Sequence, residues 1–254
     1  FRSVAGNRQS RPPDTARLLQ SVATKKPLAI VLAGHNGSGK STLWYGKLAD
    51  QLRIPLVNAD RLTLSMLPEP AGNPAVLASW AAELRDSDER WQRLSQAAVR
   101  SVVKAVIEEK LPFAYEKVFS YLAQQPDGSW RSKVDEITKF HAAGYFVALL
   151  FVGLANADLS ILRVATRRAQ GGHAVPEDKL ITRFPRTQQA IRVAAPMADL
   201  TLMFDNSRSP EDAFTMVRAQ AKTSILYDCR FAKSSADKNL MATAEPWLSF
   251  VAPL

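Results

Sequence analysis

Apolar residues gather in five short runs along the chain, and a polar or helix-like stretch follows each run. The runs cover residues 28–33, 55–59, 113–119, 145–152 and 200–204. Short apolar and β-branched runs that alternate with helical segments are typical of a parallel sheet with helical crossovers. We therefore predict an α/β fold with a five-stranded, mostly parallel sheet flanked by helices.

Three longer segments have the periodicity of helices. Apolar side chains recur every three to four positions between residues 88 and 110, which predicts an amphipathic helix. Residues 156–169 and 176–194 are predicted as two further helices, and Gly171-Gly172 separates them. Because a glycine pair can act as a hinge, we expect these two helices to form a helical lid.

The stretch GHNGSGKST matches the phosphate-loop (P-loop) pattern GxxxxGKS/T at every defined position. It follows the first apolar run and precedes a helical segment, so a chance lysine in a glycine-rich turn is the weaker interpretation. Glycines let backbone N–H groups approach phosphates, Lys40 adds a positive charge, and Ser41 offers a hydroxyl to Mg²⁺. We predict that ATP and Mg²⁺ bind here, at Gly34, His35, Asn36, Gly37, Ser38, Gly39, Lys40, Ser41 and Thr42.

Two acidic residues lie in or after the second and third apolar runs. Asp60 follows the second run, at the sheet edge where ligands bind, so its carboxylate can accept a proton from a hydroxyl; helix capping is the alternative role. Glu116 lies inside the third run and requires a ligand or a basic partner, whereas Lys117 alternates to the other face. No second strand ending in Asp or Asp-Glu stands out, which favours transfer to an acceptor over hydrolysis.

Basic residues are dense around the predicted hinge: Arg163, Arg167, Arg168, His173, Arg183 and Arg186. The first two are spaced i, i+4, so they share a helix face and can both reach a phosphate-bearing ligand. A solvated surface helix would show the same density of charge. The spacing and the adjacent hinge favour the phosphate-binding interpretation.

The charge balance of the 254 residues is basic, with 33 Lys and Arg against 24 Asp and Glu. This excess favours a polyanion or a highly phosphorylated small molecule. Aromatic residues are nearly absent from the basic segment, so a nucleic-acid partner is not expected. Cys229 is the only cysteine, which excludes an internal disulfide, and the longest apolar stretch is about half a membrane span. We expect a cytoplasmic protein without a membrane segment.

The chain divides by composition into three parts. Residues 1–26 form a basic lead-in that is mobile or helical, residues 27–225 form the P-loop domain, and residues 226–254 form an extension that the pattern does not place. The chain does not begin with methionine, which we interpret as a sign that it is a fragment of a longer protein.

The assembled motifs resemble those of the zeta-toxin family of P-loop kinases. Six pieces carry the resemblance, in this order: GHNGSGKST, NAD at 58–60, FAYEKVFS at 113–120, RVATRRAQGGHAVP at 163–176, RFPR at 183–186 and FDNS at 204–207. The resemblance implies a P-loop kinase fold with a helical lid. It also implies ATP-dependent phosphorylation of UDP-N-acetylglucosamine at the sugar 3′-hydroxyl, and it allows an antitoxin protein as a partner.

Particular roles follow from the resemblance, with Asp60 as the catalytic base. The groups implied for transfer and for the ATP phosphates are Lys40, Ser41, Asp60, Arg163, Arg167 and His173. The groups implied for the acceptor are Asp60, Glu116, Ser120 and Arg183.

The chain departs from the family pattern at two positions. Lys117 stands where the family commonly has threonine, and His173 stands where some members carry arginine. Two alternatives therefore stay open: a kinase of another nucleotide-like metabolite, or an ATP-binding effector, delivered into the cytoplasm of a target cell, in which catalysis is incidental.

Overall fold

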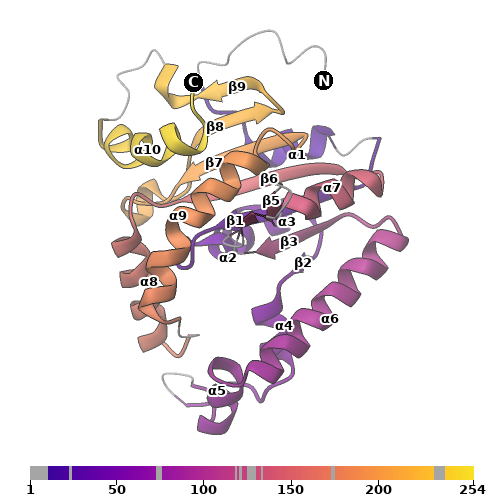
Figure 1. Cartoon of the computed structure of the whole chain (residues 1–254), viewed down its shortest axis with the longest axis vertical. Helices are drawn as coiled ribbons and strands as arrows, with labels where there is room; N and C mark the ends of the chain where they lie inside the picture. Colours follow the sequence, from indigo (N-terminus) through magenta and orange to yellow (C-terminus); the bar gives the residue numbers. More distant parts are fainter. Residues whose placement is uncertain are drawn as a thin grey trace.

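The computed structural model describes residues 11–22, 25–72, 76–117, 119, 122–124, 130–132, 134–172, 175–231 and 238–254. A central sheet lies between two helical layers, and two helical arms extend beyond one edge of the sheet (Figure 1).

The central sheet has seven strands in the order β2-β3-β1-β6-β7-β8-β9. The strands are β1 (Leu28–Gly34), β2 (Leu56–Val57), β3 (Phe113–Lys117), β6 (Phe146–Gly153), β7 (Leu200–Asp205), β8 (Thr215–Ala221) and β9 (Ser224–Asp228). The first five in this spatial order pair in parallel and correspond to the five predicted strands. The hairpin β8-β9 adds two antiparallel strands that the apolar pattern did not predict, because polar side chains interrupt both. A separate two-stranded sheet pairs β4 (Leu122–Gln124) with β5 (Trp130–Ser132).

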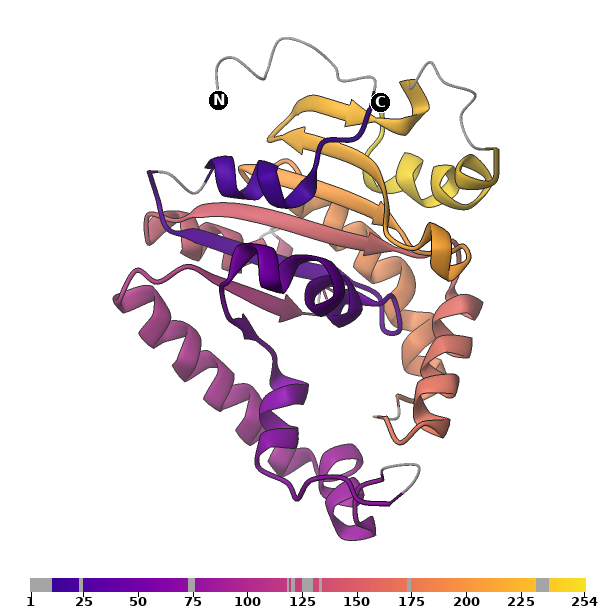
Figure 2. The same ribbon diagram turned by 180° about the vertical axis from the view of Figure 1, so that it is seen from behind.

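Helices cover both faces of the central sheet. One face carries α1 (Thr15–Val22) and the continuous helix formed by α2 (Lys40–Leu43), η1 (Trp44–Leu48) and α3 (Ala49–Leu52) (Figure 2). The other face carries α7 (Val134–Ala142), α9 (Glu177–Ala194) and α10 (Lys238–Val251). Strands β1 and β7 are buried along their whole length and β6 at every residue after Phe146, as expected for the centre of a doubly covered parallel sheet.

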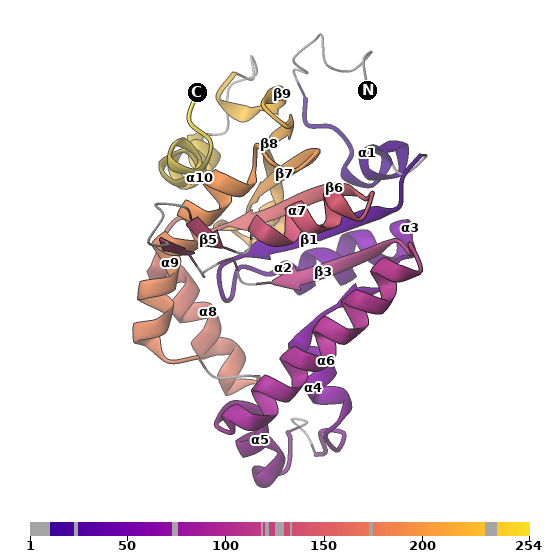
Figure 3. The same cartoon turned by 45° about the vertical axis from the view of Figure 1, so that its right-hand side comes forward.

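Two helical arms flank the carboxyl ends of the parallel strands (Figure 3). One arm consists of α4 (Ala59–Ser65), α5 (Ser79–Asp86) and α6 (Glu89–Glu108), next to β2. The other begins with α8 (Ala157–Ala169), which follows β6 and leads to α9. Side-chain caps start α6 at Asp88 and α8 at Asn156, so these two helices begin where the sequence predicted. Short 3₁₀ turns, η2 (Pro210–Asp212) and η3 (Cys229–Phe231), flank the β8-β9 hairpin.

The two ends of the described chain pack on the same core as the sheet. Ala16, Leu19 and Val22 of α1 are buried, within the segment predicted as a mobile or helical lead-in. The boundary predicted at residue 225 falls inside β9, and α10 buries Trp247 and Leu248. Among the described residues, no helix combines the length and the apolar content needed to cross a bilayer.

Candidate active site

The P-loop runs from the end of β1 to the first turn of α2. Gly37 and Gly39 have φ values of 69° and 89°, the left-handed region that glycine adopts without strain. A Cβ at Gly37 would lie 3.1 Å from the carbonyl oxygen of Ser160, and the Ser160 hydroxyl donates to the Asn36 carbonyl at 2.7 Å. The loop is therefore closely packed against α8.

Lys40 lies inside the loop, with 7% of its surface exposed. Its Nζ donates to the carbonyl of His35 at 3.0 Å and lies 3.8 Å from Oε1 of Glu116. Burial lowers the pKa of Lys40 below its usual value, while the charges of Glu116 and Asp60 raise it. The positive charge of Arg167 lowers this pKa as well. Lys40, Glu116, Asp60 and Arg167 are thus close enough to interact electrostatically.

Glu116 reaches the P-loop from the neighbouring strand, because β3 pairs with β1 and places it beside Leu32. Its Oε2 accepts a hydrogen bond from the Ser41 hydroxyl at 2.8 Å and another from Nδ2 of Asn58 at 2.6 Å. The sequence interpretation found no strand carboxylate for a metal ion. This arrangement provides a hydroxyl and a carboxylate side by side, the oxygen ligands that Mg²⁺ prefers.

Asp60 is an exposed residue in the first turn of α4. The helix cap is Asn58, whose side chain accepts from the backbone N–H groups of Asp60 and Arg61 at 2.7 and 3.2 Å. The alternative prediction, in which Asp60 itself caps the helix, is therefore wrong. The Asp60 carboxylate is not used in capping and lies at the same sheet edge as Glu116.

Helix α8 carries two of the predicted arginines to the P-loop. A Cβ at Gly37 would lie 3.2 Å from the Cβ of Arg163, so this arginine packs directly on the loop. Burial lowers the pKa of Arg163, and the carboxylate of Asp205 opposes this effect. Arg168 and Arg186 are exposed on the outer surfaces of α8 and α9.

The side chain of His35 turns away from the phosphate-binding face. Its ring stacks on Phe184 of α9 with centroids 3.9 Å apart and meets the edge of Phe151 at 5.8 Å. Burial and the charge of Lys40 lower its pKa to about 3, so the imidazole is neutral. Only the backbone of His35 faces the loop interior, where its carbonyl accepts from Lys40. Arg183 belongs to α9, like Phe184, and lies beside the His35 ring and Asn36.

The predicted hinge contacts the opposite arm. Arg85 of α5 donates to the carbonyls of Gly171 and Gly172 at 2.8 and 3.3 Å, across 86 and 87 residues of sequence. Asp86 accepts two hydrogen bonds from the same guanidinium group and fixes its orientation. Sequence analysis missed this bridge, because a single arginine in a polar segment carries no signal.

Asn206 and Phe214, both in the connection between β7 and β8, support the P-loop. Asn206 donates from Nδ2 to the carbonyl of Ser38 at 2.8 Å. A Cβ at Gly39 would lie 2.7 Å from the same nitrogen and 3.1 Å from the Phe214 ring. The FDNS segment at 204–207 entered the sequence analysis only as part of the family resemblance, and its asparagine holds the P-loop backbone.

Comparison with known proteins gives the family of this chain. The zeta toxin family model matches residues 15–212. The chain belongs to the zeta toxin family. The comparison with curated proteins finds no match.

Three solved structures share the fold of the chain. A structure from the PezAT toxin-antitoxin system of Streptococcus pneumoniae aligns over 96% of this chain and 99% of its own, with 16% identity and a TM-score of 0.51. The AvrRxo1-ORF1:AvrRxo1-ORF2 complex with sulphate aligns over 94% and 68%, with 15% identity and a TM-score of 0.58. The same complex with ATP gives 14% identity and a TM-score of 0.56. Family membership and the P-loop together identify the chain as a kinase that uses ATP.

Some positions of the zeta-toxin motif lie elsewhere or outside the described residues. Lys117, which replaces the family threonine, forms an ion pair with Glu136 of α7. It therefore points to the face of the sheet opposite Glu116, as strand alternation predicted. Ser120 and His173, predicted for the acceptor and the ATP phosphates, lie outside the described residues.

Proposed function

We propose that this zeta toxin kinase transfers the γ-phosphoryl group of ATP to a hydroxyl of a nucleotide sugar, with UDP-N-acetylglucosamine as the expected acceptor. The observation that carries the proposal is the grouping of Lys40, Glu116 and Asp60 at the carboxyl ends of neighbouring parallel strands. In α/β sheets, ligands bind at this edge. ATP on the P-loop and an acceptor over β2 would meet there.

The phosphate end of ATP would be held by the loop amides, by Lys40 and by the arginines of α8. The loop backbone is preorganised through its contacts with Ser160 and Asn206, so little reorganisation is needed on binding. Arg163 and Arg167 bring two more positive charges from α8. Such fixed charges stabilise the negative charge that spreads over the γ-phosphoryl oxygens during transfer.

Magnesium would be held by Ser41 and Glu116. The 2.8 Å separation of the Ser41 hydroxyl and the Glu116 carboxylate supports this assignment, since one ion can contact both oxygens. When bound, Mg²⁺ neutralises charge on the β- and γ-phosphates. Asn58 donates to the same carboxylate and orients it.

Asp60 is the proposed general base. Its carboxylate would accept the proton of the acceptor hydroxyl as the acceptor oxygen bonds to the γ-phosphorus and the bond to the β,γ-bridging oxygen breaks. ADP then leaves, and the proton passes from Asp60 to solvent. The capping role of Asn58 supports this assignment, because it leaves the Asp60 carboxylate available.

The identity of the acceptor rests on the family resemblance. Lys117 replaces the family threonine, so the side chain offers no hydroxyl to the acceptor, and its ammonium group pairs with Glu136 instead. This substitution favours, as the second candidate, another nucleotide-like acceptor. An antitoxin protein is the proposed partner class, by analogy with the PezAT toxin-antitoxin system.

The decisive experiment incubates the protein with ATP and Mg²⁺ against a panel of UDP-sugars, nucleosides and dinucleotides, with products identified by mass spectrometry. Asp60→Asn should slow transfer by roughly 10²- to 10⁴-fold, the usual contribution of general base catalysis. ATP binding measured by calorimetry without acceptor should persist. Asp50→Asn, an exposed acid of α3, is the matched control and should behave like the parent.

The outcomes separate the candidates. Phosphorylated UDP-N-acetylglucosamine supports the proposal, and phosphorylation of a different panel member supports the second acceptor class. ATP binding without any product across the panel supports an interaction protein instead. Parent-like activity of Asp60→Asn would move the base elsewhere, with Glu116 as the next candidate.

A further inference from the structure

The carboxylate of Asp205, at the end of β7, is fully buried and receives four hydrogen bonds. Oδ1 accepts from the Ser207 hydroxyl at 2.8 Å and from Nε1 of Trp247 at 3.2 Å. Oδ2 accepts from the Thr243 hydroxyl at 3.1 Å and from the Ser207 backbone N–H at 3.2 Å. A buried carboxylate is costly unless it is hydrogen-bonded, so the two donors from α10 are part of what keeps it in place.

The next residue, Asn206, faces the P-loop. Its backbone N–H donates to the Gly153 carbonyl at 3.1 Å and its side chain donates to the Ser38 carbonyl at 2.8 Å. Asp205 and Asn206 are consecutive, so the position of one limits the position of the other. The carboxylate also interacts electrostatically with Arg163. The end of β7 therefore supports the P-loop and an arginine proposed for the phosphates.

The indole of Trp247 packs closely on Gly153 and Phe151 of β6. A Cβ at Gly153 would lie 2.6–2.8 Å from three atoms of the ring, and the rings of Phe151 and Trp247 meet edge to face with their centroids 5.5 Å apart. Gly153 is also the register partner of Asp205 in β6. The ring is thus held where its N–H reaches the carboxylate.

We propose that Trp247 and Thr243 are positioning residues for the nucleotide. By holding Asp205, they fix Asn206 on the Ser38 carbonyl and so set the shape of the P-loop. The proposal rests on the proposed function in one respect, namely that this loop binds ATP. The family model ends at residue 212, so α10 lies beyond the segment that defines the family.

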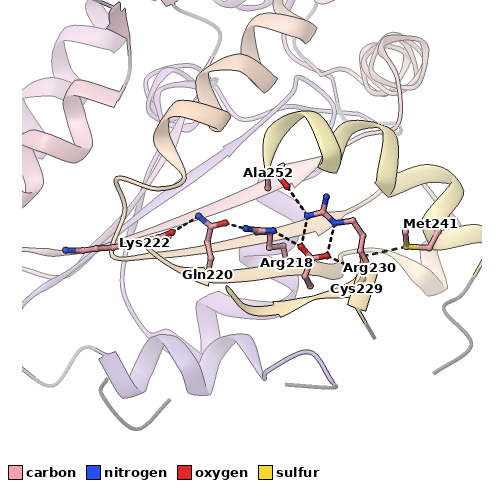
Figure 4. Close-up of polar contacts among 8 residues, drawn as sticks. Arg218, Gln220, Lys222, Cys229, Arg230, Met241 and Ala252 are labelled. Carbon is pink, nitrogen blue, oxygen red and sulfur yellow. Dashed lines mark hydrogen bonds and ion pairs between the residues drawn. The ribbon is translucent and has the colours of Figure 1, made fainter. Parts of the chain in front are cut away.

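Helix α10 has anchors that are independent of Asp205. Figure 4 shows a network in which Arg230 donates to the Ala252 carbonyl at 2.9 Å, next to the carboxyl end of the helix. Asp228 receives hydrogen bonds from both Arg230 and Arg218, and all three side chains are nearly inaccessible to solvent. Leu248 is also fully buried. Removing one donor to Asp205 should therefore leave the helix docked.

The test measures binding of ATP with Mg²⁺ by calorimetry, without an acceptor. Trp247→Phe keeps an aromatic ring at this position and removes the N–H, and Thr243→Val removes the hydroxyl at nearly constant volume. Each variant should bind ATP roughly three- to tenfold more weakly, because only part of the free energy of a hydrogen bond to a charged group is passed on to the nucleotide site. In steady-state assays KM for ATP should rise by a similar factor, with kcat changing less.

A double-mutant cycle distinguishes this route from a general loss of stability. If Trp247 acts through Asn206, Trp247→Phe should weaken ATP binding much less in an Asn206→Ala background than in the parent. Leu248→Ala is the matched control: it should lower the melting temperature and leave ATP affinity at the parent value.

Two results would overturn the inference: parent-like ATP affinity in both Trp247→Phe and Thr243→Val, or full additivity with Asn206→Ala. If the parent protein itself binds no ATP, the proposed function fails, and this inference fails with it. That outcome is visible before any variant is compared.

Discussion

Oxygen atoms of the protein surround the ammonium group of Lys40 in the way that phosphate oxygens would. Two backbone carbonyls of the loop and the Glu116 carboxylate surround its ammonium group. Phosphate oxygens of ATP would take over part of this coordination. The lysine is thus oriented in advance, which is what electrostatic catalysis of phosphoryl transfer requires.

Lys40→Ala should lower turnover by roughly 10²-fold or more, because the charge between the β- and γ-phosphates is lost. The fold should persist, since the side chain fills the loop and not the sheet core. Initial rates and a melting curve check both statements. Lys104→Ala, an exposed lysine of α6, should match the parent; near-parent activity of folded Lys40→Ala would contradict the assignment.

The neutral state of His35 predicts a loss of stability in acid. The pKa of His35 falls from 6.5 to about 3 in the folded chain. Between these two pH values the imidazole is protonated in the unfolded chain and neutral in the folded chain. The free energy of unfolding should therefore drop as pH falls from about 6.5 towards 3, and no effect is expected above pH 7. Between pH 7.5 and 5 the drop is about 2 kcal/mol.

His35→Phe keeps a ring against Phe184 and removes the titration. Chemical denaturation at pH 7.5 and pH 5 should show that the variant loses about 2 kcal/mol less than the parent. His141→Gln, a change at the carboxyl end of α7, should retain the acid sensitivity that His35 causes. Equal acid sensitivity in the parent and His35→Phe would show that the stacked ring is not its source.

At the level of single residues, sequence analysis identified the groups with a chemical signature. The P-loop, Asp60 and the strand acid Glu116 follow from motif and strand-end position. The supporting contacts of Ser160 and Asn206 do not, because they join residues more than 120 positions apart through one hydrogen bond each. The side chain of His35 was assigned to ATP by its place in the motif, and the aromatic pocket on α9 that takes it up has no local signal.

Helix α8 presents its arginines to different surroundings. Arg163 packs on the P-loop, whereas Arg167 and Arg168 are both exposed, and the charge of Arg167 lowers the pKa of Lys40. Arg163→Ala and Arg167→Ala should each lower kcat more than they raise KM for ATP, by roughly 10-fold or more, because their charges act mainly in the transition state. Arg168→Ala is the matched control and should leave both parameters unchanged. Parent-like kinetics in Arg163→Ala and Arg167→Ala, as in the control, would show that these arginines only form a solvated surface of α8.

The Arg85 bridge ties the two arms together at the predicted hinge. Arg85→Ala should release the end of α8, so amide hydrogen exchange should rise at residues 167–172. Transfer should slow because Arg167 lies one turn before the bridged carbonyls. Arg93→Ala removes an exposed arginine of α6 and serves as the control. Unchanged exchange at 167–172 would show that the bridge does not restrain the helix.

Elements with strong periodicity were predicted well, and elements with mixed polarity were not. The helices now labelled α6, α8 and α9 were predicted from their residue patterns, and the five parallel strands were predicted from the short apolar runs. Strand β8 buries Arg218 and Gln220, whose hydrogen-bond partners come from β9 and the adjoining turn. Buried polar residues whose hydrogen bonds are satisfied in this way have the same sequence pattern as exposed residues, so the hairpin was not predicted. Helix α10 was missed because Pro246 interrupts its pattern.

For the whole molecule, α10 is expected to be indispensable. Its buried residues include Leu240, Trp247, Leu248 and Val251. Each large buried apolar side chain contributes about 1.5–3 kcal/mol, and a domain has about 5–15 kcal/mol of stability in total. A chain shortened to residue 231 should therefore lack a cooperative melting transition. A sharp transition near the parent temperature would restore the predicted boundary at residue 225.

Asp205 is the last residue of β7 and Asn206 follows it directly, and their side chains contact the two layers of the molecule. Asp205 is held by the helix of one layer, and Asn206 holds the loop that begins the other. One inserted or deleted residue in β7 would exchange these two side chains, whereas a similar side chain at either position would be tolerated. Among relatives, insertions and deletions should therefore be absent between Leu200 and Asn206 and should begin only after Ser207.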